Sequence, residues 1–141
     1  MDLIKEGHDF RDAIIEVRYD RGFFSMRDRM YNFPGGCCDD TCDLFGYYLR
    51  ERYGIDSQQL VKIYAPNDPE ERRNHAVLLL EDNTIIDLTG DQIRGGCPVY
   101  VGKENSFYNA MEFERIQNNY DIEQDDRLWA DYQAIMNKLG H

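Results

Sequence analysis

The chain has 141 residues, of which 42% are hydrophobic and 13% aromatic, so residues 1–141 are long enough to form one domain with its own core. Its 27 acidic and 16 basic residues give a formal net charge of −11, which argues against nucleic acid and anionic membranes as partners, because both are bound through an excess of Lys and Arg. No signal-peptide run and no membrane-spanning apolar stretch is present, so we expect a cytoplasmic protein with free thiols.

The first part of the chain predicts helical segments separated by a turn. Residues 1–31 mix charged and apolar side chains and are expected to be helical in part. The stretch 32–36, Asn-Phe-Pro-Gly-Gly, breaks a helix because proline lacks a backbone N–H and paired glycines favour a turn. A helix is expected to start directly after this stretch and to stop at Tyr53-Gly54. Its apolar residues recur on one face: Leu44, Phe45, Tyr48 and Leu49.

The second part of the chain predicts antiparallel strands followed by helix. Apolar runs at 60–65, 75–80 and 84–89 are typical of strands, and 98–101 is a short fourth candidate. The tail, from about residue 105 to residue 139, contains helical spacing at Leu128, Tyr132, Ile135, Met136 and Leu139. The predicted fold class is therefore α+β, with a helix packed on a small antiparallel sheet.

Cys38 is the candidate nucleophile. A cysteine nucleophile needs an exposed thiolate, a base beside it and a group that orients the base. Cys38 follows the Gly-Gly turn and precedes the predicted helix, so its thiol is expected at a helix N-terminus, where backbone N–H groups and the helix dipole lower the pKa of a thiol. The carboxylates of Asp39 and Asp40 act in the opposite direction. The alternative interpretation of Cys38 is a small core residue, and Cys37 is the rival nucleophile.

His75 and Asp87 form a candidate polar pair in two otherwise apolar strands. A buried carboxylate is costly unless it is paired, and His75 is the natural partner; the alternative is a carboxylate that caps a turn through backbone N–H groups. A three-residue loop at 81–83 pairs Val77 with Asp87 and places Asp87 diagonal to His75, whereas a two-residue turn separates the two side chains. We expect the three-residue loop, because Asn83 tolerates the left-handed conformation that it needs.

This order of Cys, His and Asp resembles a small bacterial branch of the papain-like and transglutaminase-like superfamily of cysteine enzymes. The resemblance covers about residues 30–101 and rests on three segments in sequence order: Phe-Pro-Gly-Gly-Cys-Cys at 33–38, His-Ala at 75–76 and Ile-Asp-Leu-Thr-Gly-Asp-Gln at 86–92. It implies a papain/transglutaminase-like fold, with Cys38 as the nucleophile, His75 as the general base and Asp87 as the residue that orients the base.

Acyl transfer also needs hydrogen-bond donors for the oxyanion. The backbone N–H of Cys38 is one candidate, and Gln92 is a candidate side chain. Asn32, six residues before Cys38, stands where papain-like enzymes carry a glutamine; the alternative is an ordinary turn residue. We expect no cofactor and no metal, because a zinc site made of Cys37, Cys38, Cys42 and His75 would have poor spacing and no Cys-x-x-Cys pair.

The predicted function is thiol-mediated acyl transfer on an amide of a protein or peptide substrate: peptide or isopeptide hydrolysis, glutamine deamidation or transglutamination. Hydrolysis is preferred slightly, because water is the default acceptor. The alternative is a non-catalytic protein-binding module on the same fold, in which the polar trio is a buried network. The resemblance also implies an effector-like role, with delivery to another cell. The sequence indicates no oligomeric state.

Overall fold

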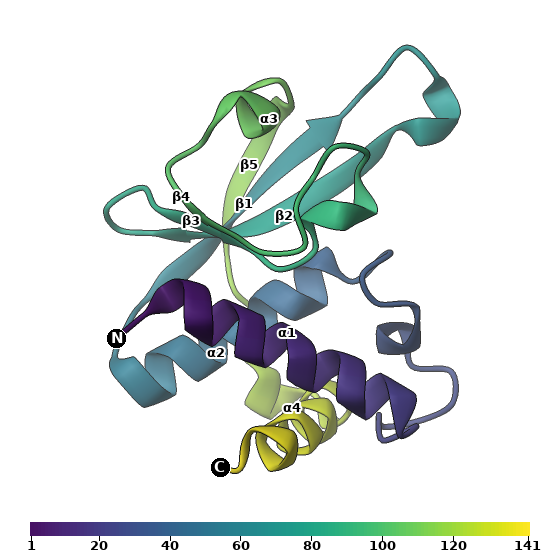
Figure 1. Ribbon diagram of the computed structural model, residues 1–141, viewed down its shortest axis with the longest axis vertical. Helices are drawn as coiled ribbons and strands as arrows, with labels where there is room; N and C mark the ends of the chain where they lie inside the picture. The colour runs from purple at the N-terminus through teal and green to yellow at the C-terminus, as the bar shows by residue number, and fades with distance from the viewer.

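Four helices and one five-stranded sheet make up the α+β fold of the computed structural model, which describes residues 1–141 (Figure 1). The helices are α1 (Leu3–Tyr19), α2 (Cys38–Tyr53), α3 (Ser106–Asn109) and α4 (Asp126–Leu139). The strands are β1 (Ser57–Tyr64), β2 (Arg73–Leu80), β3 (Ile85–Asp87), β4 (Tyr100–Gly102) and β5 (Glu112–Asn118). None of the helices is both long enough and apolar enough to cross a membrane.

The sheet is antiparallel throughout and has the strand order β4-β3-β2-β1-β5. In the β2–β3 hairpin Leu78 lies opposite Ile86. The backbone N–H of Leu80 donates to the carbonyl of Thr84 at 2.9 Å, and Asn83 has a left-handed φ of 67°. The expected three-residue loop is therefore confirmed, and the register that it fixes brings the start of β2 beside the end of β3.

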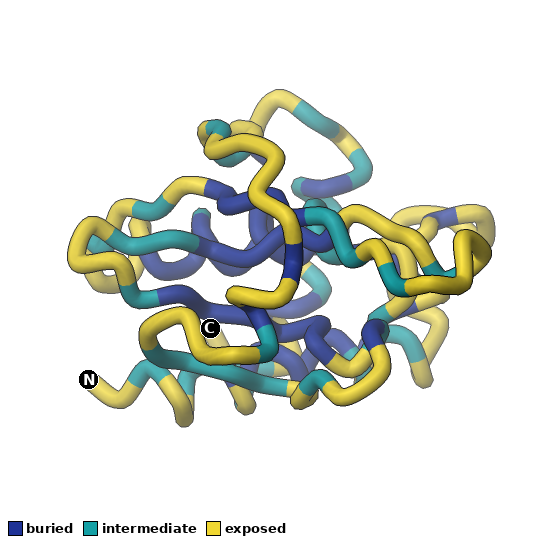
Figure 2. The backbone as a smooth tube through the Cα atoms, turned by 90° about the horizontal axis from the view of Figure 1, so that it is seen from above, coloured by how far each residue is buried: buried dark blue, intermediate teal, exposed yellow.

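The helices α1, α2 and α4 lie on one side of the sheet, and α3 lies on the other (Figure 1). Neighbouring residues of β2 alternate between the two sides, because side chains of a strand point in opposite directions. Ala76 and Leu78 belong to the large hydrophobic core under the sheet, whereas Val77 belongs to a smaller cluster on the side of α3. The buried segments gather between these layers, and the connecting loops are largely exposed (Figure 2).

The helix α2 begins and ends where the sequence predicts. It starts at Cys38, directly after Gly36, whose φ of 69° suits the absence of a Cβ atom. It ends at Gly54, which has a φ of 67° and donates its backbone N–H to the carbonyl of Arg50. This left-handed glycine cap satisfies carbonyl groups that the last turn of a helix leaves free.

The tail at 105–139 contains the predicted helix and also β5, which the sequence did not predict. The seven residues of β5 show no alternation of burial, since six of them are exposed and the other is half-buried. The strand is stabilised by its backbone pairing with β1 rather than by a buried face of its own, so it has no periodic signal. The helical spacing corresponds to α4, which begins only at Asp126.

Candidate active site

The two adjacent cysteines at the N-terminus of α2 differ in burial and in hydrogen bonding. Cys37 is fully buried, and its thiol donates hydrogen bonds to the backbone carbonyls of Arg29 and Gly35 at 3.1 and 3.3 Å. Burial raises the pKa of Cys37 to about 12. Burial also raises the pKa of Cys42, one turn further along the helix, well above the ordinary thiol value. Neither of these thiols is therefore available as a thiolate near neutral pH.

Cys38 is partly exposed and is the thiol that lies next to the imidazole. Burial opposes its ionisation, but hydrogen bonds from the side chain of His75, from the backbone of Ala76 and from the side chain of Gln92 outweigh that effect. The pKa of Cys38 is therefore lowered. The same residue is the first of α2, where the helix dipole favours an anion. Of the two candidate nucleophiles in the sequence, Cys38 has the environment that activates a thiol.

His75 and Asp87 meet as a buried pair, each about 1% exposed. The Nε2 atom of His75 lies 2.7 Å from the Oδ2 atom of Asp87. Burial favours the neutral imidazole, but the hydrogen bond to Asp87 and the neighbouring Cys38 outweigh it and raise the pKa of His75 to about 9. These contacts stabilise a Cys38 thiolate and a His75 imidazolium relative to the two neutral groups.

The carboxylate of Asp87 receives further hydrogen bonds that the sequence did not predict. The hydroxyl of Tyr108 donates to Oδ2 at 2.7 Å, and the backbone N–H of Thr89 donates to Oδ1 at 2.9 Å. A Cβ atom on Gly90 would lie 2.9 Å from the same Oδ2 atom, so the absence of a side chain there leaves room for the carboxylate. These donors allow a buried Asp87 to keep its charge and fix its orientation toward His75.

Gln92, rather than Asn32, is the candidate oxyanion side chain beside the triad. The Nε2 atom of Gln92 lies 2.7 Å from Nδ1 of His75, and its Oε1 atom accepts a hydrogen bond from the backbone N–H of Gly36 at 3.3 Å. Asn32 is exposed and its side chain makes no hydrogen bond. It ends the short helical turn Arg29–Asn32, and its backbone carbonyl accepts from Gly35. The structure therefore does not bring Asn32 together with the other predicted residues.

The electrostatic opposition expected from the carboxylates after Cys38 is largely removed by two arginines. Asp40 is buried, and it accepts hydrogen bonds from Nε of Arg29 at 2.6 Å and from Nη2 of Arg127 at 3.2 Å. Two guanidinium groups thus neutralise the charge of Asp40. The side chain of Asp39 is 51% exposed, so solvent screens its effect on the thiol.

The site lies near the surface and encloses little empty space. A small void of about 10 Å³ lies against Cys38, between α2 and the sheet. No three His, Cys, Asp or Glu side chains converge as a metal site would require. Cys37, Cys38, Cys42 and His75, the zinc alternative considered from the sequence, therefore do not form such a group. Gly35 and Gly36 are exposed beside Cys38, so a substrate backbone can approach the thiol closely.

The arrangement meets the requirements of nucleophilic catalysis by cysteine: an activated thiol, an imidazole beside it and a carboxylate that orients the imidazole. These groups come from α2, β2 and β3, and Gln92 and Tyr108 add contacts from later segments. Comparisons with protein-family models, with curated protein sequences and with solved structures found no match to this chain.

Proposed function

We propose that the protein is a cysteine-dependent hydrolase or acyltransferase of papain-like or transglutaminase-like type, acting on an amide bond. The observation that carries this proposal is the continuous set of contacts from Cys38 through His75 to Asp87. Both the lowered pKa of Cys38 and the raised pKa of His75 arise from these contacts. A cysteine that served only as a core residue would have a raised thiol pKa, as Cys37 and Cys42 do.

The first half of the reaction forms a thioester. The Cys38 thiolate attacks the amide carbonyl carbon, and the electron pair of the C=O bond moves onto the oxygen. The imidazole Nδ1 atom, the ring nitrogen that is not held by Asp87, gives its proton to the leaving nitrogen. The tetrahedral intermediate then collapses, the carbon–nitrogen bond breaks and an amine leaves. Asp87 keeps the Nε2–H oriented throughout.

The second half releases the acyl group. Water, or an amine in the case of transglutamination, attacks the thioester carbonyl while Nδ1 of His75 takes up its proton. The carbon–sulfur bond breaks, and the Cys38 thiolate is restored beside the imidazolium. Water is the default acceptor, so we prefer hydrolysis of peptide or isopeptide bonds, or deamidation of glutamine, over transfer to an amine.

Gln92 is suited to stabilise the oxyanion in these steps. When His75 is neutral, its Nδ1 atom carries no proton and accepts a hydrogen bond from the side-chain N–H of Gln92. When the Cys38 proton moves to His75, Nδ1 becomes a donor and this hydrogen bond is lost. The amide N–H of Gln92 is then free for the oxygen of a substrate. The backbone N–H of Cys38 supplies a second donor, because the first N–H groups of a helix have no partner within it.

The substrate that fits this site is a protein or peptide. The near-absence of empty volume at Cys38 does not favour a small molecule enclosed on all sides. An extended backbone or a side-chain amide reaches an open surface thiol without a deep cavity.

Alkylation by a peptide-like electrophile tests the proposal. The native protein is treated with a peptidyl vinyl sulfone near pH 7, and the labelled residue is identified by mass spectrometry. The label should be found on Cys38. Cys38 should also react faster than a free thiol such as glutathione. Cys38→Ser is the control and should lose the label. Preferential labelling of Cys37, Cys42 or Cys97, or a rate equal to that of glutathione, would favour the alternative of a non-catalytic binding module with a buried polar network.

A further inference from the structure

Arg11 is a buried arginine of α1 that takes no part in the triad. Only 9% of its surface is exposed, and it lies one helical turn after Gly7, on the same face of α1. A Cβ atom on Gly7 would lie 3.1 Å from the side chain of Leu88, so the glycine lets α1 approach the loop that follows β3 closely. A buried guanidinium is costly unless its charge and its N–H groups find partners. The partners of Arg11 therefore show which segments α1 holds in place.

The hydrogen bonds of Arg11 all go to the loop between β3 and β4, which carries Gln92. Its Nη1 atom donates to the backbone carbonyl of Leu88 at 2.6 Å and to that of Pro98 at 3.3 Å, near the two ends of the loop. Nη1 and Nη2 also donate to the two carboxylate oxygens of Asp91, at 3.1 and 2.8 Å. This forked geometry is specific to arginine, and it fixes the residue directly before Gln92 as well as both ends of its loop.

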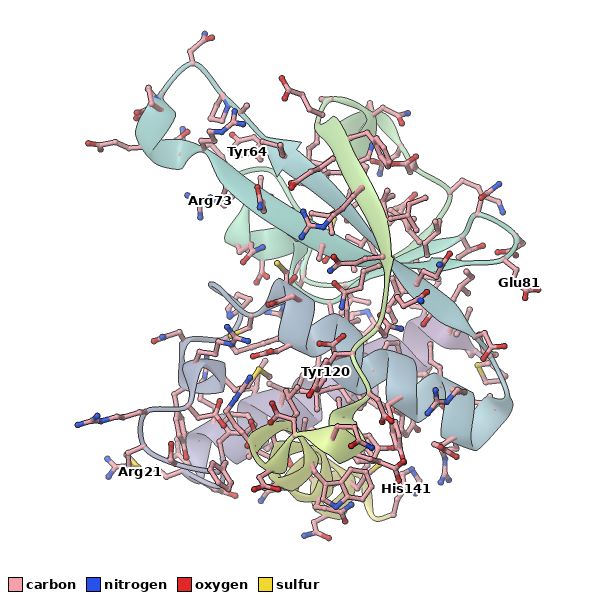
Figure 3. All side chains as sticks on the ribbon, turned by 180° about the vertical axis from the view of Figure 1, so that it is seen from behind. Arg21, Tyr64, Arg73, Glu81, Tyr120 and His141 are labelled. Carbon is pink, nitrogen blue, oxygen red and sulfur yellow. The ribbon has the colours of Figure 1, made fainter.

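The loop between β3 and β4 is compact, so its residues move together. A Cβ atom on Gly96 would lie 1.9 Å from the carbonyl oxygen of Gly90, which leaves no space between these two parts of the loop. Arg73, labelled at the start of β2 in Figure 3, donates to the carbonyl of Gln92 at 3.2 Å. Arg73 is exposed, however, and water can replace its hydrogen bond. Arg11 is therefore the buried, charged group that holds this loop.

Arg11 also contacts the turn that precedes the nucleophile. Its guanidinium carbon lies 5.0 Å from the centre of the ring of Phe33, which is buried directly before the Pro-Gly-Gly turn. Gln92 contacts the same turn through the backbone N–H of Gly36. One side chain of α1 thus touches both the turn that leads to Cys38 and the loop that carries Gln92.

These contacts fix the two parts of the proposed oxyanion site relative to each other. We propose that Arg11 is a positioning residue, which holds the side-chain amide of Gln92 where it can stabilise an oxyanion formed at Cys38. The inference rests on the proposed function, in which Gln92 supplies that donor.

Comparison of two reactions of Cys38 in the full chain at pH 7 tests this role. In acylation by p-nitrophenyl acetate the thiolate attacks the ester carbonyl carbon and the electron pair of the C=O bond moves onto the oxygen. When the pair returns, the carbon–oxygen bond breaks and p-nitrophenolate leaves; the release by Cys38→Ser is subtracted. Alkylation by iodoacetamide displaces iodide and forms no oxyanion, so its rate at Cys38, read by mass spectrometry, reports only the thiolate and its accessibility.

The variants separate positioning from a general loss of structure. Arg11→Lys keeps the charge but not the fork, so it should slow acylation about fivefold and leave alkylation within about twofold of the native rate. Gln92→Ala should slow acylation about tenfold, and Arg11→Lys added to it should cause no further loss. Arg50→Lys is the matched control and should change neither rate, because the contacts of Arg50 lie within α2. Asp91→Asn weakens the same fork and should show the same selective loss, which keeps the test valid if Arg11→Lys does not fold.

Three outcomes would overturn the inference alone. They are an equal fall of both rates in Arg11→Lys, an acylation rate equal to the native one, and the same loss on addition of Arg11→Lys whether or not Gln92 is present. Acylation of native Cys38 no faster than that of glutathione would instead overturn the proposed function, and the role of Arg11 with it.

Discussion

Removal of one hydroxyl group, by Tyr108→Phe, tests whether the buried network around Asp87 stabilises the fold and the proposed active site. The hydroxyl donates to Oδ2 of Asp87 at 2.7 Å, and both residues are almost completely buried. A hydrogen bond to a charged group contributes about 1.5–3 kcal/mol, and the substitution removes only an oxygen atom, so little cavity forms. Urea denaturation at pH 7 should show a free energy of unfolding that is about 2 kcal/mol lower.

Tyr100→Phe is the matched control for this substitution. The ring of Tyr100 lies 5.2 Å from that of Tyr108, but its hydroxyl donates to the exposed carbonyl of Lys103. Water can replace that hydrogen bond, so the loss should be below about 0.5 kcal/mol. Tyr108→Phe should also slow the alkylation of Cys38, because an Asp87 that is less firmly held orients His75 less well. Equal stability losses in the two variants would refute the argument, since ring packing rather than the bond to Asp87 would then explain them.

Three further predictions concern charged groups. His75→Ala should shift the pH profile of Cys38 alkylation toward the ordinary thiol pKa, and an unchanged profile would show that His75 is not the partner of the thiol. Asp87→Ala should lower both the alkylation rate and the urea midpoint, because it leaves His75 buried without its carboxylate; a midpoint equal to that of the native protein would contradict this. Burial raises the pKa of Asp43 to about 7, and burial together with the neighbouring Asp28 also raises the pKa of Asp131, so the folded state retains protons that the unfolded chain releases above about pH 4. Stability should therefore fall as the pH rises from 4 to 8, and urea midpoints of Asp43→Asn should fall less over the same range.

The elements that the sequence predicts well are those with a local physical cause. The Pro-Gly-Gly turn directly precedes α2, and Gly54 ends it. Asn83 indicates the loop length that aligns His75 with Asp87. That alignment follows from the two-residue period of a strand, so the pair was predictable without any tertiary information.

The residues that the sequence missed act through long-range contacts. Tyr108 reaches Asp87 from a helix of four residues, across 21 positions of sequence, and no periodicity marks it. The offset of Asn32 from Cys38 predicts a position at the site, but Asn32 ends a helical turn and its side chain is exposed to solvent. A fixed offset in sequence predicts a side-chain position only where the intervening backbone is the same.

Arg127 connects the C-terminal helix to the segment that precedes the nucleophile. Its guanidinium lies 3.0 Å from Asp28, before the turn, and 3.1 Å from Asp40, in the first turn of α2. Both carboxylates are buried, so removal of the arginine would leave two buried charges with fewer partners. Because the loop and α2 are held by the same side chain, the position of Cys38 depends on α4, although α4 provides no residue to the triad. The family resemblance covers only about residues 30–101 and so omits Arg127. The C-terminal helix therefore contributes to the geometry of the proposed active site although it lies outside that resemblance.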